Sequence, residues 1–162
     1  MIVGILSDTH GRLPATIAAM EALRKAKAEF YIHCGDVGGE EILNELAGLP
    51  CAFVWGNNDY ERVALARYAK SIGVQCLGNF GELELGGKSF AVFHGDDFGL
   101  SRRLMAEKKH DYLLQGHSHV RMDERAGTMR LINPGALHRA SPKSCAVLDT
   151  ETDKLQFLTI LA

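Results

Sequence analysis

The sequence predicts an α/β fold in which two stacked, mixed β-sheets are flanked by helices. Strand patterns alternate with amphipathic helix patterns in the first half of the chain, which is typical of a parallel βαβ sheet. The second half is richer in strand patterns and can supply a second sheet. We therefore expect the two sheets to pack face to face, with the helices outside.

In the first half, each strand pattern is followed by a helix pattern. The expected strands are 1–6, 30–34 and 51–55, and the expected helices are 13–28, 40–46 and 59–71. Pro14 lies in the first turn of the first helix, where its missing N–H costs little. Asp59 is a residue type that caps helix N-termini, so we expect the third helix to begin there.

In the second half, Gly86-Gly87 lies between two strand patterns and predicts a hairpin with a two-residue turn. One helix is expected at 100–109. The remaining expected strands are 112–115, 129–132, 144–148 and 155–161. We find no repeat, low-complexity tract or linker, so residues 1–162 are expected to form a single domain.

Composition excludes several classes of protein. The 162 residues are 46% hydrophobic and 23% charged, with a net charge of -2, which gives no electrostatic footprint for general nucleic-acid binding. No apolar run approaches the ~20 residues of a membrane span, and the N-terminus reads as a strand rather than a signal peptide. The four cysteines have no C-x-x-C spacing, and Cys34 and Cys51 lie in apolar runs. We expect packed, reduced thiols and a cytoplasmic location.

Short motifs made of oxygen and imidazole ligands follow one another along the chain, nearly all directly after apolar runs. They are Asp8-Thr9-His10, Gly35-Asp36, Gly56-Asn57-Asn58-Asp59, His94-Gly95 and Gly116-His117-Ser118-His119. Asp8 and His10 would point the same way in an extended segment, so both could reach one ion. Taken alone, each aspartate could cap a loop, Asn57 could form a tight turn, and His94 could be a hydrogen-bonded core histidine. The ordered set is what favours a metal site.

The order and residue types of these motifs resemble the calcineurin-like metallophosphoesterases, and the short length resembles their small YfcE-type phosphodiesterase branch. The resemblance covers the chain from Asp8 to about Gly135. It implies the same sandwich of two sheets and a centre of two metal ions that share Asp36. The ligands it implies are Asp8, His10, Asp36 and His119 for one ion, and Asp36, Asn57, His94 and His117 for the other.

Mixed carboxylate and imidazole ligands suit Mn²⁺, Fe, Zn²⁺, Ni²⁺ or Co²⁺ better than Mg²⁺ or Ca²⁺, and we expect Mn²⁺. Two such ions form the arrangement for in-line attack at phosphorus, in which a hydroxide between the ions is the nucleophile. The residues expected at the reacting centre are Asp36, Asn57, Asn58 and His94.

The chain departs from the resemblance at Asn58, where many relatives carry a histidine that can protonate the leaving oxygen. An amide cannot deliver this proton, which leaves Asp96, Asp97 and His138 as candidate acids. Arg139 is a candidate phosphate contact. Asn133-Pro134-Gly135 resembles a late turn beneath the family's site, although a plain Pro-Gly turn explains it equally well.

Three features are better explained by structure than by chemistry. His33 is expected to point into the sheet, and Asp59 to cap a helix or support Asn57 without binding metal. The basic residues of the fourth helix pattern are expected to form a solvated face, with the alternative that its arginines border the substrate groove. They are Arg102, Arg103, Lys108 and Lys109.

We expect a dinuclear metal-dependent phosphoesterase that hydrolyses phosphodiesters or activated phosphoesters of small substrates. A phosphomonoesterase acting on a small metabolite is the first alternative. A non-catalytic scaffold of the same fold is the second, and the superfamily's retromer subunit is the precedent, although that subunit departs at ligand positions. A nuclease for long nucleic acid is disfavoured by the absent basic excess. Assembly into a homo-oligomer is left open.

Overall fold

Eleven strands and four helices make up the chain. The computed structural model describes residues 1–162. In chain order the elements are β1 (Ile2–Leu6), α1 (Leu13–Lys25), β2 (Phe30–His33), α2 (Glu40–Leu46), β3 (Cys51–Phe53), α3 (Arg62–Ser71), β4 (Gln75–Cys76), β5 (Phe80–Leu85), β6 (Lys88–Phe93), α4 (Phe98–Glu107), β7 (Tyr112–Leu114), β8 (Met122–Ala126), β9 (Met129–Asn133), β10 (Lys143–Asp149) and β11 (Lys154–Ile160).

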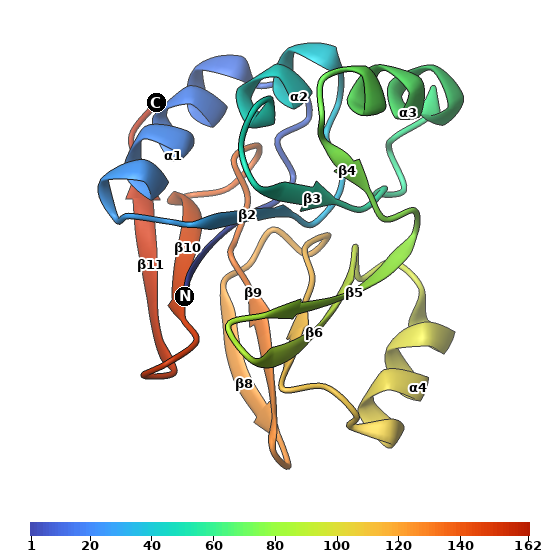
Figure 1. Ribbon diagram of the computed structural model, residues 1–162, viewed down its shortest axis with the longest axis vertical. Helices are drawn as coiled ribbons and strands as arrows, with labels where there is room; N and C mark the ends of the chain where they lie inside the picture. Colours follow the sequence, from blue (N-terminus) through green and yellow to red (C-terminus); the bar gives the residue numbers. More distant parts are fainter.

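The strands form two mixed sheets, as the sequence predicted (Figure 1). The six-stranded sheet has the order β11-β10-β1-β2-β3-β4, in which β1 to β4 are parallel and β10 and β11 are antiparallel to their neighbours. The five-stranded sheet has the order β5-β6-β7-β9-β8, with β6, β7 and β9 parallel and antiparallel strands at both edges. Parallel neighbours end at the same edge of a sheet, so each sheet gathers several loops at one edge.

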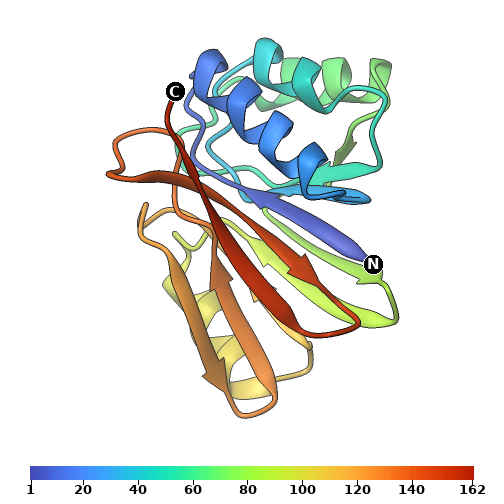
Figure 2. The same ribbon diagram turned by 90° about the vertical axis from the view of Figure 1, so that its left-hand side faces the viewer.

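Helices and sheets pack in four layers with three apolar cores between them (Figure 2). Leu23 and Leu43 belong to the core between α1–α3 and the six-stranded sheet. Phe90 belongs to the core between the two sheets. Phe93, three residues later on the same strand, points to the opposite face and packs with Leu104 of α4. Because successive side chains of β6 point to opposite faces of the sheet, this strand contributes to both the core between the sheets and the core beneath α4.

The predicted hairpin is confirmed. Leu85 of β5 pairs with Lys88 of β6, which leaves Gly86 and Gly87 as the two turn residues. Their φ angles are 57° and 74°. Such left-handed angles at both central positions define the turn that matches the twist of adjacent strands, and glycine adopts them without strain.

Some boundaries differ from the prediction. The third helix begins at Arg62 and not at Asp59, because the Asp59 carboxylate accepts hydrogen bonds from backbone groups of its own loop and of the loop after β2 instead of capping the helix. β4 has two residues, too few to show a pattern. β8 was also missed, because it is an edge strand whose sequence, Met122–Ala126, carries three charged residues and no apolar alternation.

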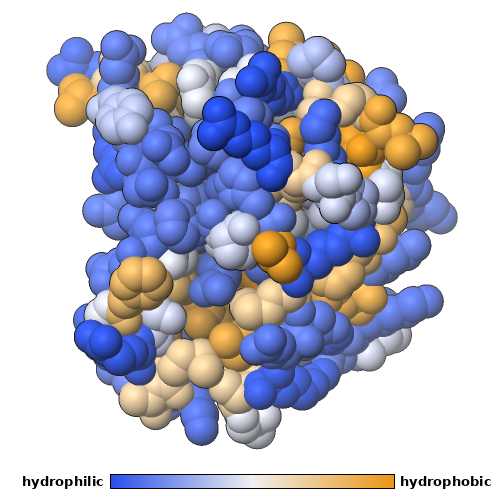
Figure 3. All heavy atoms as spheres, turned by 180° about the vertical axis from the view of Figure 1, so that it is seen from behind, coloured by the Kyte–Doolittle hydropathy of each residue, from blue (hydrophilic) through white to orange (hydrophobic).

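The surface is largely hydrophilic over the middle of the face in Figure 3, and hydrophobic side chains gather at its upper right. The four basic residues around α4 are exposed, which confirms the predicted solvated face. Cys34 and Cys51 are buried, as expected for packed thiols. None of the helices has the length and apolar character that a membrane span needs.

Packing between the sheets is predicted to dominate stability. Phe90 has no exposed surface, so Phe90→Ala should lower the free energy of unfolding by about 3–5 kcal/mol. Phe98→Ala is the matched control, because the Phe98 side chain is 72% exposed and its loss should change stability by less than about 0.5 kcal/mol. Urea denaturation of both variants measures the difference. Equal losses in the two would contradict this packing.

Candidate metal centre

The predicted ligands lie in loops that leave the carboxyl ends of parallel strands. Asp8 follows β1, Asp36 follows β2, and Asn57 follows β3 in the six-stranded sheet. His94 follows β6, and His117 and His119 follow β7 in the five-stranded sheet. The packing of the two sheets brings both sets of loops together, so residues more than 100 positions apart meet.

Asp8, His10 and His119 form one group that could hold a metal ion. Asp8 Oδ1 lies 3.2 Å from His119 Nε2 and 3.8 Å from His10 Nε2. The other Asp8 oxygen, Oδ2, accepts hydrogen bonds from Ser7 Oγ and from the backbone N–H of His117. One oxygen is thus held by the protein, and the other faces the imidazoles.

Asp8, Asp36 and His94 form a second such group. Asp36 Oδ2 lies 3.3 Å from Nε2 of both His10 and His94, so its carboxylate stands between the two histidines. His94 Nδ1 lies 2.8 Å from the backbone oxygen of Cys34 and donates to it, which leaves Nε2 as the nitrogen without a proton in the neutral ring.

Asn57 and His117 lie together on the exposed side of the centre. Asn57 Oδ1 is 3.2 Å from His117 Nδ1, and the His117 ring is 5.2 Å from the His94 ring between centroids. The structure therefore brings five of the predicted ligands into the two close groups and sets the remaining pair beside His94.

Three buried polar atoms at the centre have no hydrogen-bond partner. They are Asp8 Oδ1, His10 Nε2 and His94 Nε2. A buried polar atom without a partner is costly, and it is rare in folded proteins. Divalent cations bound at the two groups would satisfy all three, and the donor set of carboxylate and imidazole suits a transition metal. The residues present thus fit a divalent metal ion, as the sequence predicted.

The negative aspartates and the positive histidines of the centre stabilise each other's charged forms. Burial raises the pKa of Asp8 and of Asp36, but contacts with His10 and Ser7 for Asp8, and with His94 and Asn58 for Asp36, outweigh it and hold both pKa values below the ordinary range. Burial lowers the pKa of His94, but Asp36 and Asp8 outweigh it and raise that pKa to about 9. In the metal-free protein a proton therefore occupies the place where a cation would bind.

The backbone is strained at the ligands. A left-handed conformation costs a non-glycine residue about 1–2 kcal/mol. Five of the predicted ligands adopt it, namely Asp8 (φ 53°), His10 (φ 45°), Asp36 (φ 56°), His117 (φ 69°) and His119 (φ 62°). Such strain persists where surrounding structure enforces it, and it concentrates at functional sites.

Close backbone approach requires glycine at two positions. A Cβ atom on Gly56 would lie 2.1 Å from Asp36 Oδ1, and one on Gly116 would lie 2.0 Å from Ser7 Oγ. Both distances are far below van der Waals contact, so neither loop could pass as close to the aspartates with any side chain.

Two further residues tie the loops together. His33 is fully buried, accepts from the Gly35 N–H and contacts Thr9 Oγ1 at 2.9 Å, which confirms a structural role. Asp59 accepts from the backbone N–H groups of Gly56, Val37 and Gly38. Its predicted role as a helix cap is wrong, because its carboxylate joins the loop after β3 to the loop after β2. Only the fold reveals this role.

The Asn133-Pro134-Gly135 turn supports the last motif. Asn133 is buried, and its amide donates to the backbone oxygen of Gly116 and to Ser118 Oγ. Its Oδ1 accepts from the Gly135 N–H, which closes the turn. The turn therefore fixes the loop that carries His117 and His119.

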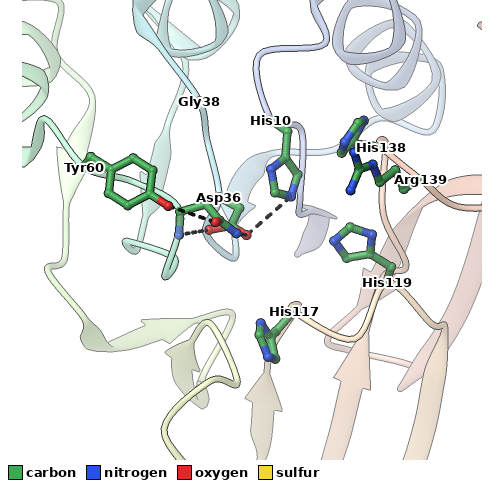
Figure 4. A pocket seen from close by; sticks show the side chains of 9 residues that line it. His10, Asp36, Gly38, Tyr60, His117, His119, His138 and Arg139 are labelled. Atoms are coloured by element: carbon green, nitrogen blue, oxygen red, sulfur yellow. Dashed lines mark hydrogen bonds and ion pairs between the residues drawn. The ribbon is translucent and has the colours of Figure 1, made fainter.

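The centre opens into a cleft of about 510 Å³ (Figure 4). Asn58 lies in this cleft, and its backbone N–H and side-chain amide both donate to Asp36. Tyr60 donates to Asn58 Oδ1 on one side, and His138 and Arg139 lie on the other side, beyond His10. Asp96 and Asp97 do not line the cleft, and Asp97 caps α4 instead.

The family follows from comparison with known proteins. Residues 1–153 match the model of the calcineurin-like phosphoesterase superfamily domain. The chain belongs to this superfamily. It is 30% identical over 156 residues to phosphodiesterase MJ0936 of Methanocaldococcus jannaschii, covering 93% of this chain and 94% of that protein. It is 27% identical over 164 residues to phosphodiesterase YfcE of Escherichia coli K12, covering 90% and 85% of the two chains.

A solved structure agrees with this membership. The structure of a protein described as a novel archaeal phosphodiesterase superposes with a TM-score of 0.91 at 28% identity, covering 99% of this chain and 100% of that one. The resemblance seen in the sequence is confirmed, together with the two-sheet fold. The enzyme class, a metal-dependent phosphoric ester hydrolase, is confirmed as well.

The close approach at Gly56 gives a direct test of the centre. Gly56→Ala should push Asp36 from its place and lower the Mn²⁺ affinity by at least about tenfold, since displaced supports of ligands typically cost 10–100-fold. Gly99→Ala is the control, because a Cβ atom there meets nothing nearer than 3.4 Å. Calorimetric titration with Mn²⁺ compares the two, and unchanged affinity in Gly56→Ala would show that the loops do not need this contact.

Metal binding should release a proton. Neutral imidazole binds metal, and His94 with a pKa of about 9 is mostly protonated at pH 8 in the metal-free protein. The Mn²⁺ affinity should therefore rise between pH 7 and 9, and binding at pH 8 should release about one proton from this ring. Calorimetry in buffers of different ionisation enthalpy counts the protons. A pH-independent affinity across this range would contradict the charge state assigned to His94.

Proposed function

We propose that this protein is a dinuclear phosphoesterase that hydrolyses phosphodiesters or activated phosphoesters of small molecules. The observation that carries this proposal is the set of unpartnered buried atoms, Asp8 Oδ1, His10 Nε2 and His94 Nε2. They belong to the two ligand groups, whose members His10, Asp36 and His119 line a cleft large enough for a small phosphoester. The names of the relatives, both phosphodiesterases, support the choice of a diester.

The proposal assigns seven ligands to two ions. Asp8, His10 and His119 hold one ion with Asp36. This assignment is supported because the first three side chains lie within ion-binding distance of one another and Asp36 Oδ2 lies 3.3 Å from His10 Nε2. Asn57, His94 and His117 hold the other ion, and Asp36 is shared, since it stands midway between His10 and His94. We propose Mn²⁺ as the ion and the cytoplasm as the location.

When bound, the ions would make a water molecule acidic enough to attack phosphorus and would neutralise charge on the phosphoryl oxygens. The protein itself positions the metal ligands and the phosphoryl group. Asn57 has an exposed amide whose N–H₂ group is free to donate to a phosphoryl oxygen. Asn58 lines the cleft and fixes the Asp36 carboxylate through two hydrogen bonds, so it orients the shared ligand.

The shared ligand provides the first test. Asp36→Asn should lower kcat/KM on an aryl phosphodiester by at least about a hundredfold and reduce the bound metal from two ions, because it weakens both sites together. Asp96→Asn is the control, since Asp96 is an exposed aspartate outside the cleft. Elemental analysis after dialysis with Mn²⁺ gives the stoichiometry. A wild-type value of one ion or none would refute the dinuclear proposal.

Substrate choice separates the diesterase from the monoesterase. We propose that a diester is cleaved faster than a monoester with the same leaving group, and parallel assays with p-nitrophenyl esters measure this directly. The reverse order, with the monoester at least tenfold faster, would favour the alternative of a phosphomonoesterase.

Leaving groups provide the last test. With Asn58 in place of a histidine, rates should depend steeply on leaving-group pKa, with aryl esters fast and alkyl esters slow. General-acid help is typically worth 10²–10⁴-fold, so Asn58→His should raise turnover of alkyl esters relative to that of aryl esters. A series of aryl and alkyl diesters on both proteins gives the dependence. If wild type already shows a flat dependence with chemistry rate-limiting, another residue supplies the proton.

A further inference from the structure

One wall of the cleft carries arginine side chains that form no ion pair within the protein. His138 and Arg139 line the cleft beside His10 and His119, and Arg12 contacts His138 from behind. The ion pairs made by arginines in this structure involve only Arg125 and Arg130. The guanidinium groups of Arg12 and Arg139 are therefore free to bind an anion, in the bidentate geometry that suits phosphate and carboxylate groups.

The backbone at Arg139 shares the strain of the ligands. Its φ is 46°, in the left-handed region that L side chains rarely adopt. Most other non-glycine residues with this conformation are predicted ligands, and the exceptions lie after helices or in a turn between strands. Strain of this kind concentrates at functional positions, so it supports a functional role for Arg139 at the cleft.

The contact with Arg12 fixes which nitrogen of His138 carries the proton. A guanidinium group can only donate, so its Nε–H at 3.2 Å makes His138 Nδ1 the acceptor. The neutral ring then bears its proton on Nε2 and acts as a donor. This tautomer is the reverse of that of a neutral His94 ring, in which Nε2 carries no proton and can bind metal, so His138 is suited to hydrogen-bond an anion.

A second cavity, of about 360 Å³, adjoins the cleft at His138. Arg12 lies in its wall together with the apolar side chains of Pro14, Ala15 and Leu137. His138 is the residue that lines both cavities. A substrate arm that leaves the metal centre on this side would pass His138 and meet the two free guanidinium groups.

We propose that Arg139, Arg12 and His138 form a subsite for a second anionic group of the substrate, carried on an ester arm and separate from the scissile phosphate. Arg139 and His138 contact this group, and Arg12 both attracts it and positions His138. The favoured substrates are then phosphodiesters whose retained arm bears a phosphate, phosphonate or carboxylate group. This inference rests on the proposed phosphodiesterase function.

The activity test uses two p-nitrophenyl phosphodiesters whose second arm ends in a hydroxyl group or in a phosphonate group. Wild type should show a kcat/KM about tenfold higher for the phosphonate arm, mainly through a lower KM, as one charge-assisted hydrogen bond would give. Arg139→Ala should abolish the preference between the two arms, and Arg139→Lys should restore part of it. Arg103→Ala, at an exposed arginine of α4 outside the cleft, should change neither.

Binding without metal gives a readout that does not depend on activity. Propylphosphonate added to the metal-free protein should shift the side-chain NMR signals of Arg139 and His138, and Arg139→Ala should weaken this binding about tenfold. Arg12→Ala should change the ¹⁵N shifts of His138 from the pattern of an Nε2–H ring, which loss of a merely structural contact elsewhere would not do. Raising the salt concentration should weaken binding, because the guanidinium groups are exposed.

Each outcome separates this inference from the proposed function. Equal kcat/KM for the two arms overturns the subsite and leaves the phosphodiesterase intact. Equal slowing of both substrates by Arg139→Ala places Arg139 on the scissile phosphate and also overturns the subsite. No hydrolysis of either substrate with Mn²⁺ refutes the proposed function, and the binding experiment then decides the subsite alone: shifts that Arg139→Ala removes support it, and their absence overturns it.

Discussion

The burial of two carboxylates, Asp8 and Asp36, is the constraint on which the rest of the structure depends. Their exposed fractions are 0% and 2%. A buried charge is stable only when it is paired and hydrogen-bonded. Backbone N–H groups, hydroxyl groups and amides satisfy the outer oxygens, but Asp8 Oδ1 has no protein partner. The fold therefore concentrates negative charge at a point where only cations, either protons on histidines or metal ions, can balance it.

This constraint explains why the backbone is least regular where the chemistry is concentrated. The aspartates can sit side by side only if their loops approach more closely than side chains allow, which is why Gly56 and Gly116 lie against them. The same crowding forces the ligand residues into left-handed conformations. Each left-handed conformation costs free energy, and the regular packing of two sheets and four helices supplies the stability that offsets this cost.

Side chains that bind no metal hold this strained arrangement in place. Asp59 connects the loops after β2 and β3 through three backbone N–H groups, and His33 connects the loops after β1 and β2 through Thr9 and Gly35. Asn133 braces the loop that carries His117 and His119. The ligand loops of each sheet are thus tied to one another, and the contacts of His94 with Cys34 and of His117 with Asp8 join the loops of the two sheets.

The sequence by itself determined the fold class, most of the strands and helices, and the residue types of the centre. These follow from local signals: apolar periodicity, the two-glycine turn, and ligand motifs placed after strands. It missed β8, because an exposed edge strand has no apolar alternation, and it assigned Asp59 to a helix cap, because sequence shows the residue type but not the partner.

Only the tertiary structure decided which side chains meet. The unpartnered Asp8 oxygen, the two close groups of ligands, and the cationic wall of Arg12, His138 and Arg139 arise from contacts between loops of two different sheets. Arg12 and His138 are 126 positions apart. Periodicity describes how a segment relates to the layer above or below it, but it carries no information on distances between loops. Those distances are set when the sheets pack.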